Sequence, residues 1–303
     1  MQSALKNLKH KPVARGLAYM LGACFFFSLM CVCVYAAAFW EPALPAIAIS
    51  FVRVAINLAV VLIPAIASRK IGALWGDKRP SLWLRGFFGG SALMLSFAAI
   101  QLLGLAESAF LAASSGIIIV ALGPWVLQQK NSPLTWIAIL GAFCGIGLIF
   151  SPFDWGAGAT PGRIMALGCS LLSAMAYLMV ARAGKSNAPG TVVFYFCVVS
   201  IALHLGWFAY AGFSWPQTGS VWVLAIVGGI AASIAQLLMT YAYQNAPAAL
   251  VSSVGYTAPV MNLLWGVALF NQIPGSNALA GCLLILLCGV ALPFLTARVK
   301  TKT

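Results

Sequence analysis

Polar side chains recur at helical spacing inside segments of this chain that are otherwise apolar. In the segment 221–243 they are Ser233, Gln236, Thr240 and Tyr243. Because the spacings are three, four and three residues, all four fall on one face of a helix. A shorter run in the segment 163–180 comprises Ser170, Ser173 and Tyr177. Hydrocarbon cannot satisfy such groups, so we expect both faces to contact neighbouring helices or a water-filled cavity.

One basic residue, Arg53, lies well inside an apolar segment, 44–67. A cation at the centre of a bilayer costs at least about 2.5–3.5 kcal/mol, so such residues usually face protein or a water-filled cavity. Two interpretations stay open. Arg53 either has a structural or gating role, paired with Glu41 or Glu107 near the external surface, or it binds a substrate carboxylate directly.

These patterns together predict the residues that line a substrate cavity. The candidates are Ser28, Arg53, Gln101, Ser115, Ser173, Tyr177, Gln236, Thr240, Tyr256, Asn262 and Trp265. For each serine the alternative is a hydrogen bond within its own helix, and for Trp265 it is packing. Gln236 favours the cavity interpretation, because its amide has four hydrogen-bonding sites to satisfy.

The sequence contains no grouping of residues typical of catalysis or metal binding. All eight cysteines lie inside apolar segments, which is typical of packing residues rather than of a disulfide framework. His10 and His204 are far apart, with no cluster of cysteines or carboxylates beside them. We therefore expect no metal, no cofactor and no enzymatic activity.

Ten apolar stretches must position these residues. A bilayer core about 30 Å thick needs roughly 20 apolar residues of helix to cross it. The stretches cover residues 13–38, 44–67, 82–103, 108–127, 134–150, 163–180, 191–211, 221–243, 248–270 and 278–296. With 62% hydrophobic and only 7% charged residues, the composition excludes an ordinary soluble domain. We predict an all-α polytopic membrane protein with ten transmembrane helices.

The basic residues set the orientation of these helices. If the N-terminus lies on the cytoplasmic side, fifteen of the seventeen Lys and Arg residues fall on that side, with Arg163 outside and Arg53 within a span. The positive-inside rule disfavours the opposite orientation, so we expect an inner-membrane protein with both termini in the cytoplasm. This partition also explains the net charge of +13, and we expect no nucleic acid as a partner.

The two halves of the chain resemble each other weakly. Gly16 to Gly22 matches Gly162 to Gly168, and four more short matches follow in the same order at separations of 138–146 residues. We predict a five-helix repeat in residues 1–152, an external linker in 153–161 and a second repeat in 162–303. An odd number of helices per repeat turns the second copy upside down, so the pair is inverted around a central cavity.

Several short segments resemble the drug/metabolite transporter superfamily, specifically its EamA-type members, over the whole chain. In the first half these are residues 22–28, Arg53, Arg85-Gly86, residues 98–109 and Pro124, and in the second half residues 241–248, Pro259 and Gly281. Members commonly end the fourth and ninth helices with a Glu followed by a basic residue, whereas this chain has Gln128-Gln129-Lys130 and Asn271-Gln272.

The resemblance implies a cavity lined mainly by the first, third, fourth, sixth, eighth and ninth helices. It also implies that the fifth and tenth helices pack at the periphery, where Gly141 and Gly145 form a small-residue face. A homodimer through these two helices stays open. Well-known bacterial members look like exporters of amino acids and related metabolites.

The predicted function is a secondary transporter for a small amphipathic metabolite, such as an amino acid, a related compound or a metallophore-like product, working by alternating access. Export is the expected direction, and the partners are this metabolite and the lipid bilayer. The alternatives are uptake of a vitamin- or nucleoside-like molecule, or a channel or structural membrane protein. One arginine argues against strongly charged substrates such as sugar phosphates. Exchange, facilitated diffusion and a proton coupling through tyrosine, His204 or the substrate all stay open.

Overall fold

The computed structural model describes residues 2–126, 133–150 and 159–300, and every regular element in these ranges is a helix. The helices are α1 (Gln2–Trp40), α2 (Ala46–Ala67), the 3-10 helix η1 (Ile71–Trp75), α3 (Pro80–Leu103), α4 (Leu105–Ala113), α5 (Ser115–Val126), α6 (Pro133–Phe150), α7 (Ala159–Ala183), α8 (Pro189–Ala211), α9 (Gly219–Asn245), α10 (Ala248–Gly255), α11 (Thr257–Phe270) and α12 (Ser276–Lys300). Most of the predicted linker 153–161 and the segment Gln128-Gln129-Lys130 lie outside the described residues.

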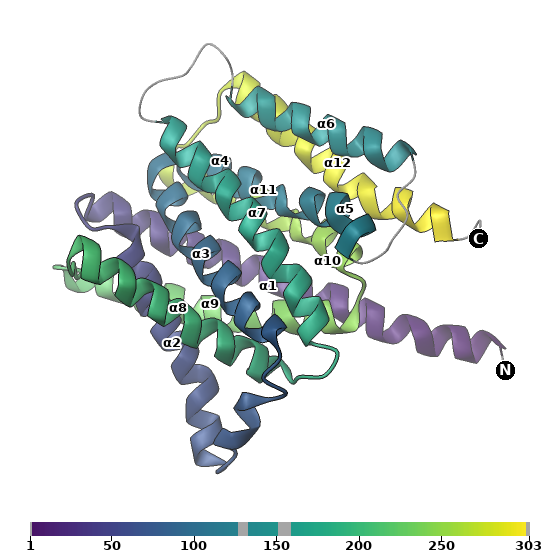
Figure 1. Cartoon of the computed structure of the whole chain (residues 1–303). Coiled ribbons are helices and arrows are strands. Elements are labelled where there is room, and N and C mark those ends of the chain that lie inside the picture. Colours follow the sequence, from purple (N-terminus) through teal and green to yellow (C-terminus); the bar gives the residue numbers. More distant parts are fainter. Residues whose placement is uncertain (1, 127–132, 151–158, 301–303) are drawn as a thin grey trace.

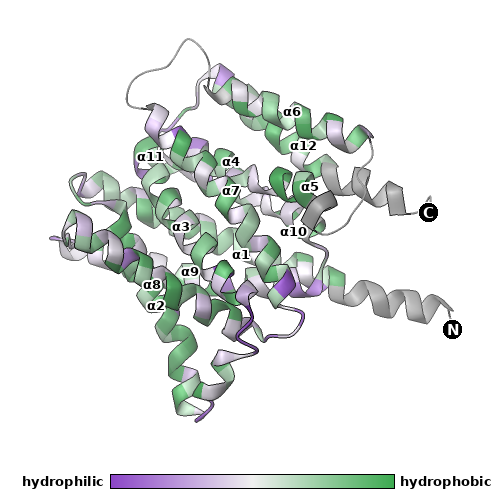
Figure 2. Cartoon of the chain, in the orientation of Figure 1, coloured by the Kyte–Doolittle hydropathy of each residue, from purple (hydrophilic) through white to green (hydrophobic). Residues whose placement is uncertain are grey.

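Eight segments of the described chain are long and apolar enough to cross a membrane. Two shorter apolar helices, Trp136–Leu148 and Ser276–Ala291, lie within α6 and α12. Large apolar side chains remain on the outside of the bundle, and Ile137 and Leu140 on α6 are each 63% exposed. In Figure 2 apolar colour covers most of the helices, while hydrophilic ribbon gathers where η1 runs into α3 and α7 into α8. The protein is a polytopic α-helical membrane protein.

Two of the predicted apolar stretches, 108–127 and 248–270, are each divided into two helices. The first is interrupted at Ser114, between α4 and α5, and the second at Tyr256, between α10 and α11. At both points the chain tightens into hydrogen bonds between residues three apart, such as Tyr256 N–H to Ser253 O at 3.2 Å. Pro259 contributes to the second break, because it lacks the N–H that would bond Gly255 O.

The bundle is held by long pairings between helices that are distant in sequence. In Figure 1, α1 runs along α9 and α3 runs along α7, while α6 and α12 form a pair to one side. Glycine allows the closest approaches. A Cβ at Gly86 would come within 2.7 Å of the Tyr195 backbone oxygen on α8, and one at Gly145 within 2.9 Å of Gly281 O on α12. The predicted small-residue face of α6 is therefore used within the chain.

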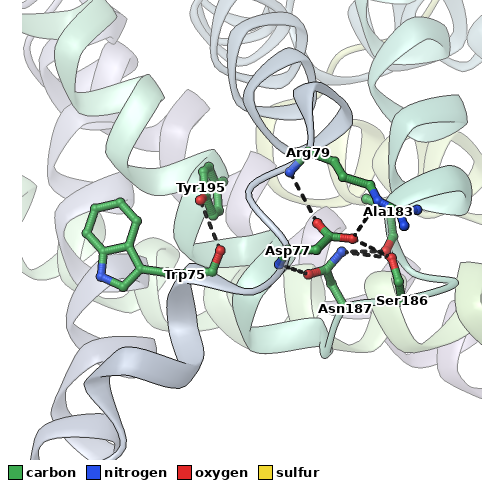
Figure 3. Close-up of polar contacts among 7 residues, drawn as sticks. All are labelled: Trp75, Asp77, Arg79, Ala183, Ser186, Asn187 and Tyr195. Atoms are coloured by element: carbon green, nitrogen blue, oxygen red, sulfur yellow. Dashed lines mark hydrogen bonds and ion pairs between the residues drawn. The ribbon is translucent and has the colours of Figure 1, made fainter.

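Polar contacts join loops at both ends of α2, whose 22 residues span about 33 Å. At one end, Glu41 accepts hydrogen bonds from the Thr218 hydroxyl at 2.6 Å and from the backbone N–H groups of Gln217 and Thr218. At the other, Asp77 accepts one from the Ser186 hydroxyl at 2.7 Å, and its backbone N–H donates to Asn187 Oδ1 at 3.0 Å (Figure 3). These hydroxyl donors hold the pKa of both carboxyls below their usual range.

Candidate functional site

A central cavity lies where the helices of the two halves meet. Its volume is about 210 Å³, many times the ~10–15 Å³ that one water needs. Its walls come from α1, α3, α4, α5, α7, α9, α10 and α11, with Arg53 added by α2 and Phe196 by α8. In the part of the chain that the structure describes, α6 and α12 contribute no lining residue. The arrangement agrees with what the family resemblance implied.

Arg53 lines this cavity from the middle of α2 and is only 5% exposed. Its guanidinium carbon lies 5.8 Å from the centre of the Phe27 ring and 5.6 Å from that of Phe97, near enough for cation–π attraction. The Nε atom is buried and has no hydrogen-bond partner among the described residues. An unpartnered buried donor on a cation is costly, which points to a ligand that supplies the acceptor.

Neither carboxylate considered as a partner for Arg53 contacts it. Glu41 is bound to the loop before α9, as described above, and Glu107 on α4 pairs with Arg163 on α7, with Oε1 and Nε 2.6 Å apart. The alternative in which Arg53 pairs with Glu41 or Glu107 is therefore wrong. Each carboxylate instead accepts from other donors: Glu41 from Gln217 and Thr218, and Glu107 from Arg163.

A second arginine, Arg85, lines the same cavity, although the sequence placed it among the inner cations. Since α3 already begins at Pro80, Arg85 lies more than one turn inside the helix and is 2% exposed. Its guanidinium lies 4.6 Å from the centre of the Phe196 ring, and its Nε has no partner among the described residues. Gly89, one turn later, makes room for it, because a Cβ there would overlap the guanidinium. The Gly89-Gly90 pair is the sequence signal that could have revealed this.

Four more predicted residues line the cavity with uncharged polar groups. They are Ser115, Ser173, Gln236 and Asn262. Gln236 on α9 is 3% exposed and its Nε2 has no partner among the described residues. Asn262 on α11 interacts with the thiol of Cys31 on α1. These groups can donate to, or accept from, a polar solute in the cavity.

Tyr177 contributes an aromatic wall. Its ring stacks on that of Tyr243, with centroids 5.3 Å apart and planes 21° from parallel. Both rings line the cavity, and the Tyr243 hydroxyl lies 3.2 Å from Ser252 Oγ. The pair presents a flat apolar surface with polar edges.

Five predicted residues do not line the cavity. The Ser28 and Thr240 hydroxyls donate to carbonyls in their own helices, at 2.8 Å each, and Gln101 binds the start of α2 through Ala46 N–H and Leu44 O. Tyr256 is buried where α10 meets α11, against Gly116 and Gly289, and Trp265 packs on the hydrophobic core. The alternative given for serine, a hydrogen bond within its own helix, holds for Ser28, and Thr240 makes the same kind of bond.

His204 is buried between α8 and α2, outside the cavity lining. Its Nδ1 lies 2.7 Å from Ser200 O and its Nε2 2.5 Å from Ser50 Oγ. Because a carbonyl only accepts, Nδ1 carries a proton. All eight cysteines are free, and within the described ranges no three His, Cys, Asp or Glu residues are grouped as metal ligands.

Comparison with known proteins agrees with this arrangement. Residues 160–294 match the EamA-like transporter family. The chain is 26% identical over 280 residues to the pseudopaline exporter CntI of Pseudomonas aeruginosa, covering 91% of this chain and 95% of the relative. It is also 26% identical to a riboflavin transporter of Vibrio cholerae, with 93% of each chain covered, and to solute carrier family 35 member G1 of Mus musculus, with 89% and 76% covered. A crystal structure with 19% identity and a TM-score of 0.69 covers 95% of this chain and 99% of the other, and shows the same fold.

A multi-pass membrane protein built around a solute-sized cavity, with transporters as its relatives over nearly its whole length, is a membrane transporter. Two of those relatives are named for the solutes they move. The second half of the chain contains an EamA domain, and together with the transporters that match nearly the whole chain it supports assignment to the drug/metabolite transporter superfamily.

Proposed function

We propose that the protein exports a small amphipathic metabolite, such as an amino acid, a related compound or a metallophore-like product, across the inner membrane. It works by alternating access of two inverted five-helix repeats, residues 1–152 and 162–303, joined by an external linker at 153–161. The observation that carries the proposal is a cavity between the two halves whose surrounding contacts occur in pairs.

The helix pairings support the inverted repeat. When α1, α2 and α3 are exchanged for α7, α8 and α9, the α1–α9 contact becomes the α7–α3 contact, and both are extensive. The same exchange turns the α2–α9 contact into the α8–α3 contact. The α6–α12 and α2–α8 contacts map onto themselves. This is the pattern expected of two copies related by a two-fold axis.

The loop contacts support the inversion. Glu41, between α1 and α2, binds Thr218, between α8 and α9. Ser186, between α7 and α8, binds Asp77, between η1 and α3. The exchange converts one contact into the other, yet they lie at the two ends of α2. Twin contacts at opposite ends favour repeats that point in opposite directions, and fifteen inner cations favour cytoplasmic termini.

The relatives and the cavity support the cargo class. CntI is named as an exporter of pseudopaline. In this chain the cavity joins two arginines and two amides to tyrosine rings and apolar walls, a combination suited to a small molecule with a polar end and an apolar body. Uptake is the second candidate, because the stacked Tyr177–Tyr243 pair suits a flat ring and one relative is named a riboflavin transporter.

The test is a metabolite profile of medium and cells with and without overproduction of the protein. Accumulation of one compound outside the overproducing cells supports export, whereas enrichment inside them supports uptake and overturns export. The compound so identified is then loaded into liposomes that hold the purified protein. Saturable, stereoselective flux is expected, and flux that never saturates overturns the carrier mechanism in favour of a channel.

A further inference from the structure

We propose that the cargo is an organic acid, and that its carboxylate binds between Arg53 and Arg85 while its apolar body lies against Tyr177 and Tyr243. This inference rests on the proposed transport function and names its substrate class. The arginines reach the cavity from adjacent helices, α2 and α3, and each carries a buried Nε with no partner among the described residues.

The charge of these two arginines has no protein counterion in the described structure. The chain has only four acidic residues. Glu41 is held by Thr218, Asp77 by Ser186 and Glu107 by Arg163, and all three lie outside the cavity lining. The fourth, Asp154, lies outside the described residues. Because Arg53 and Arg85 line the same cavity, an anion bound there offsets two buried positive charges and their loss of hydration.

The geometry of the guanidinium group favours an oxyanion. Its planar fork of N–H donors matches the two oxygens of a carboxylate, which can accept two parallel hydrogen bonds. Phe27, Phe97 and Phe196 flank the two guanidinium groups through their ring faces and leave the Nε donors without acceptors. The aromatic contacts therefore orient the cations but do not neutralise them.

The rest of the cavity favours a carboxylate with an apolar or aromatic body over a multiply charged phosphate ester. Among the described residues the lining is uncharged apart from the arginines, and the stacked tyrosine pair supplies a flat surface. Gln236 offers one further unpartnered donor for a second polar group. The sequence alone, with a single arginine in view, argued against strongly charged cargo. The second arginine moves the expectation to an organic anion.

The experiment measures thermal unfolding of the purified, full-length protein in detergent with matched pairs of probes: benzoate and benzamide, then succinate and succinamide. Each pair has nearly the same shape and differs in charge. At about 10 mM acid, ten times a dissociation constant of about 1 mM, we expect a rise in Tm of roughly 2–4 °C with an acid and none with its amide. Phenyl phosphate is the third probe, and a larger shift with it than with benzoate overturns the choice of carboxylate.

The variants Arg53→Gln and Arg85→Gln should each abolish the acid-dependent shift. Arg182→Gln, which removes an exposed cation on α7, should leave it unchanged. Arg85→Lys keeps the charge and loses the fork, so the shift should shrink without vanishing. Without ligand, each Gln variant should be at least as stable as the wild type, because a buried uncompensated charge is removed; a large loss of stability would mean that the arginines are structural.

Equal shifts with acid and amide, no shift with any acid, or an unchanged shift in both Gln variants overturns the inference. The outcomes are separable from those of the proposed function. If the protein transports a solute but no acid changes its Tm, only the proposed substrate class is overturned. If acids stabilise the protein through both arginines but the liposomes show no flux, the proposed transport function is overturned and the acid-binding site stands.

Discussion

The Glu107–Arg163 pair joins α4 to α7, and both helices line the cavity. Oε1 and Nε are 2.6 Å apart, and the side chains are 23% and 10% exposed respectively. Removing one partner of a fully buried pair costs about 3–5 kcal/mol, while a solvated pair contributes about 0–1 kcal/mol. This pair lies between those limits, so we expect Glu107→Gln to cost about 2 kcal/mol. That corresponds to a fall in Tm of roughly 3–6 °C.

The assay is a double-mutant cycle of thermal unfolding in detergent, with Glu107→Gln, Arg163→Gln and the double variant. Once Arg163 is neutral, Glu107→Gln should cost little, and the coupling between the two residues should exceed about 1 kcal/mol. A Glu107→Gln effect of the same size in both backgrounds would refute the reasoning, because stabilisation would then not come from the ion pair.

Three further predictions concern packing, pH and the cavity. Gly86→Ala should lower Tm, because its Cβ would lie 2.7 Å from a backbone oxygen of α8, whereas Gly206→Ala meets nothing within 4 Å and should raise stability by up to about 1 kcal/mol. The pKa of Asp77 is lower in the folded state than its unfolded-state pKa of about 3.9, so the ionised carboxylate stabilises the fold above that pH. This stabilisation is lost as the pH falls through the folded-state pKa. Below pH 4 the Tm should therefore fall less in Asp77→Asn than in the wild type. Gln236→Leu should slow flux in liposomes without lowering Tm, because it removes an unpartnered buried amide while keeping a similar volume; unchanged flux would place Gln236 outside the transport path.

The sequence predicted the helical segments well because membrane spans depend on local composition. It did not predict the breaks at Ser114 and Tyr256, since both stretches are continuously apolar and the tightened turns form within them. Pro259 was the one local signal, and it lies three residues beyond the second break.

Burial by distant helices was harder to predict. Arg85 was counted with the inner cations because charge statistics treat the start of a span as solvent-accessible, and only the packing of α3 against α7 and α8 encloses it. Conversely, Thr240 lies on the polar stripe of α9 yet donates to Gln236 O in its own helix. Spacing identifies a face of a helix, but the neighbouring helices decide which members of that face remain free to bind.

The most extensive helix contacts of this fold have counterparts when the two halves are exchanged, but the two cavity arginines have none. Arg53 and Arg85 both belong to the first half, and the positions that match them in the second half, by the spacing of the short repeats, are Cys197 and Leu224. An acid held by its carboxylate on α2 and α3 would therefore face the second half with its apolar body and with any second polar group, at Gln236. Such a cargo would keep one orientation relative to the protein throughout transport, because the described part of the second half lines the cavity with no arginine to which its carboxylate could transfer.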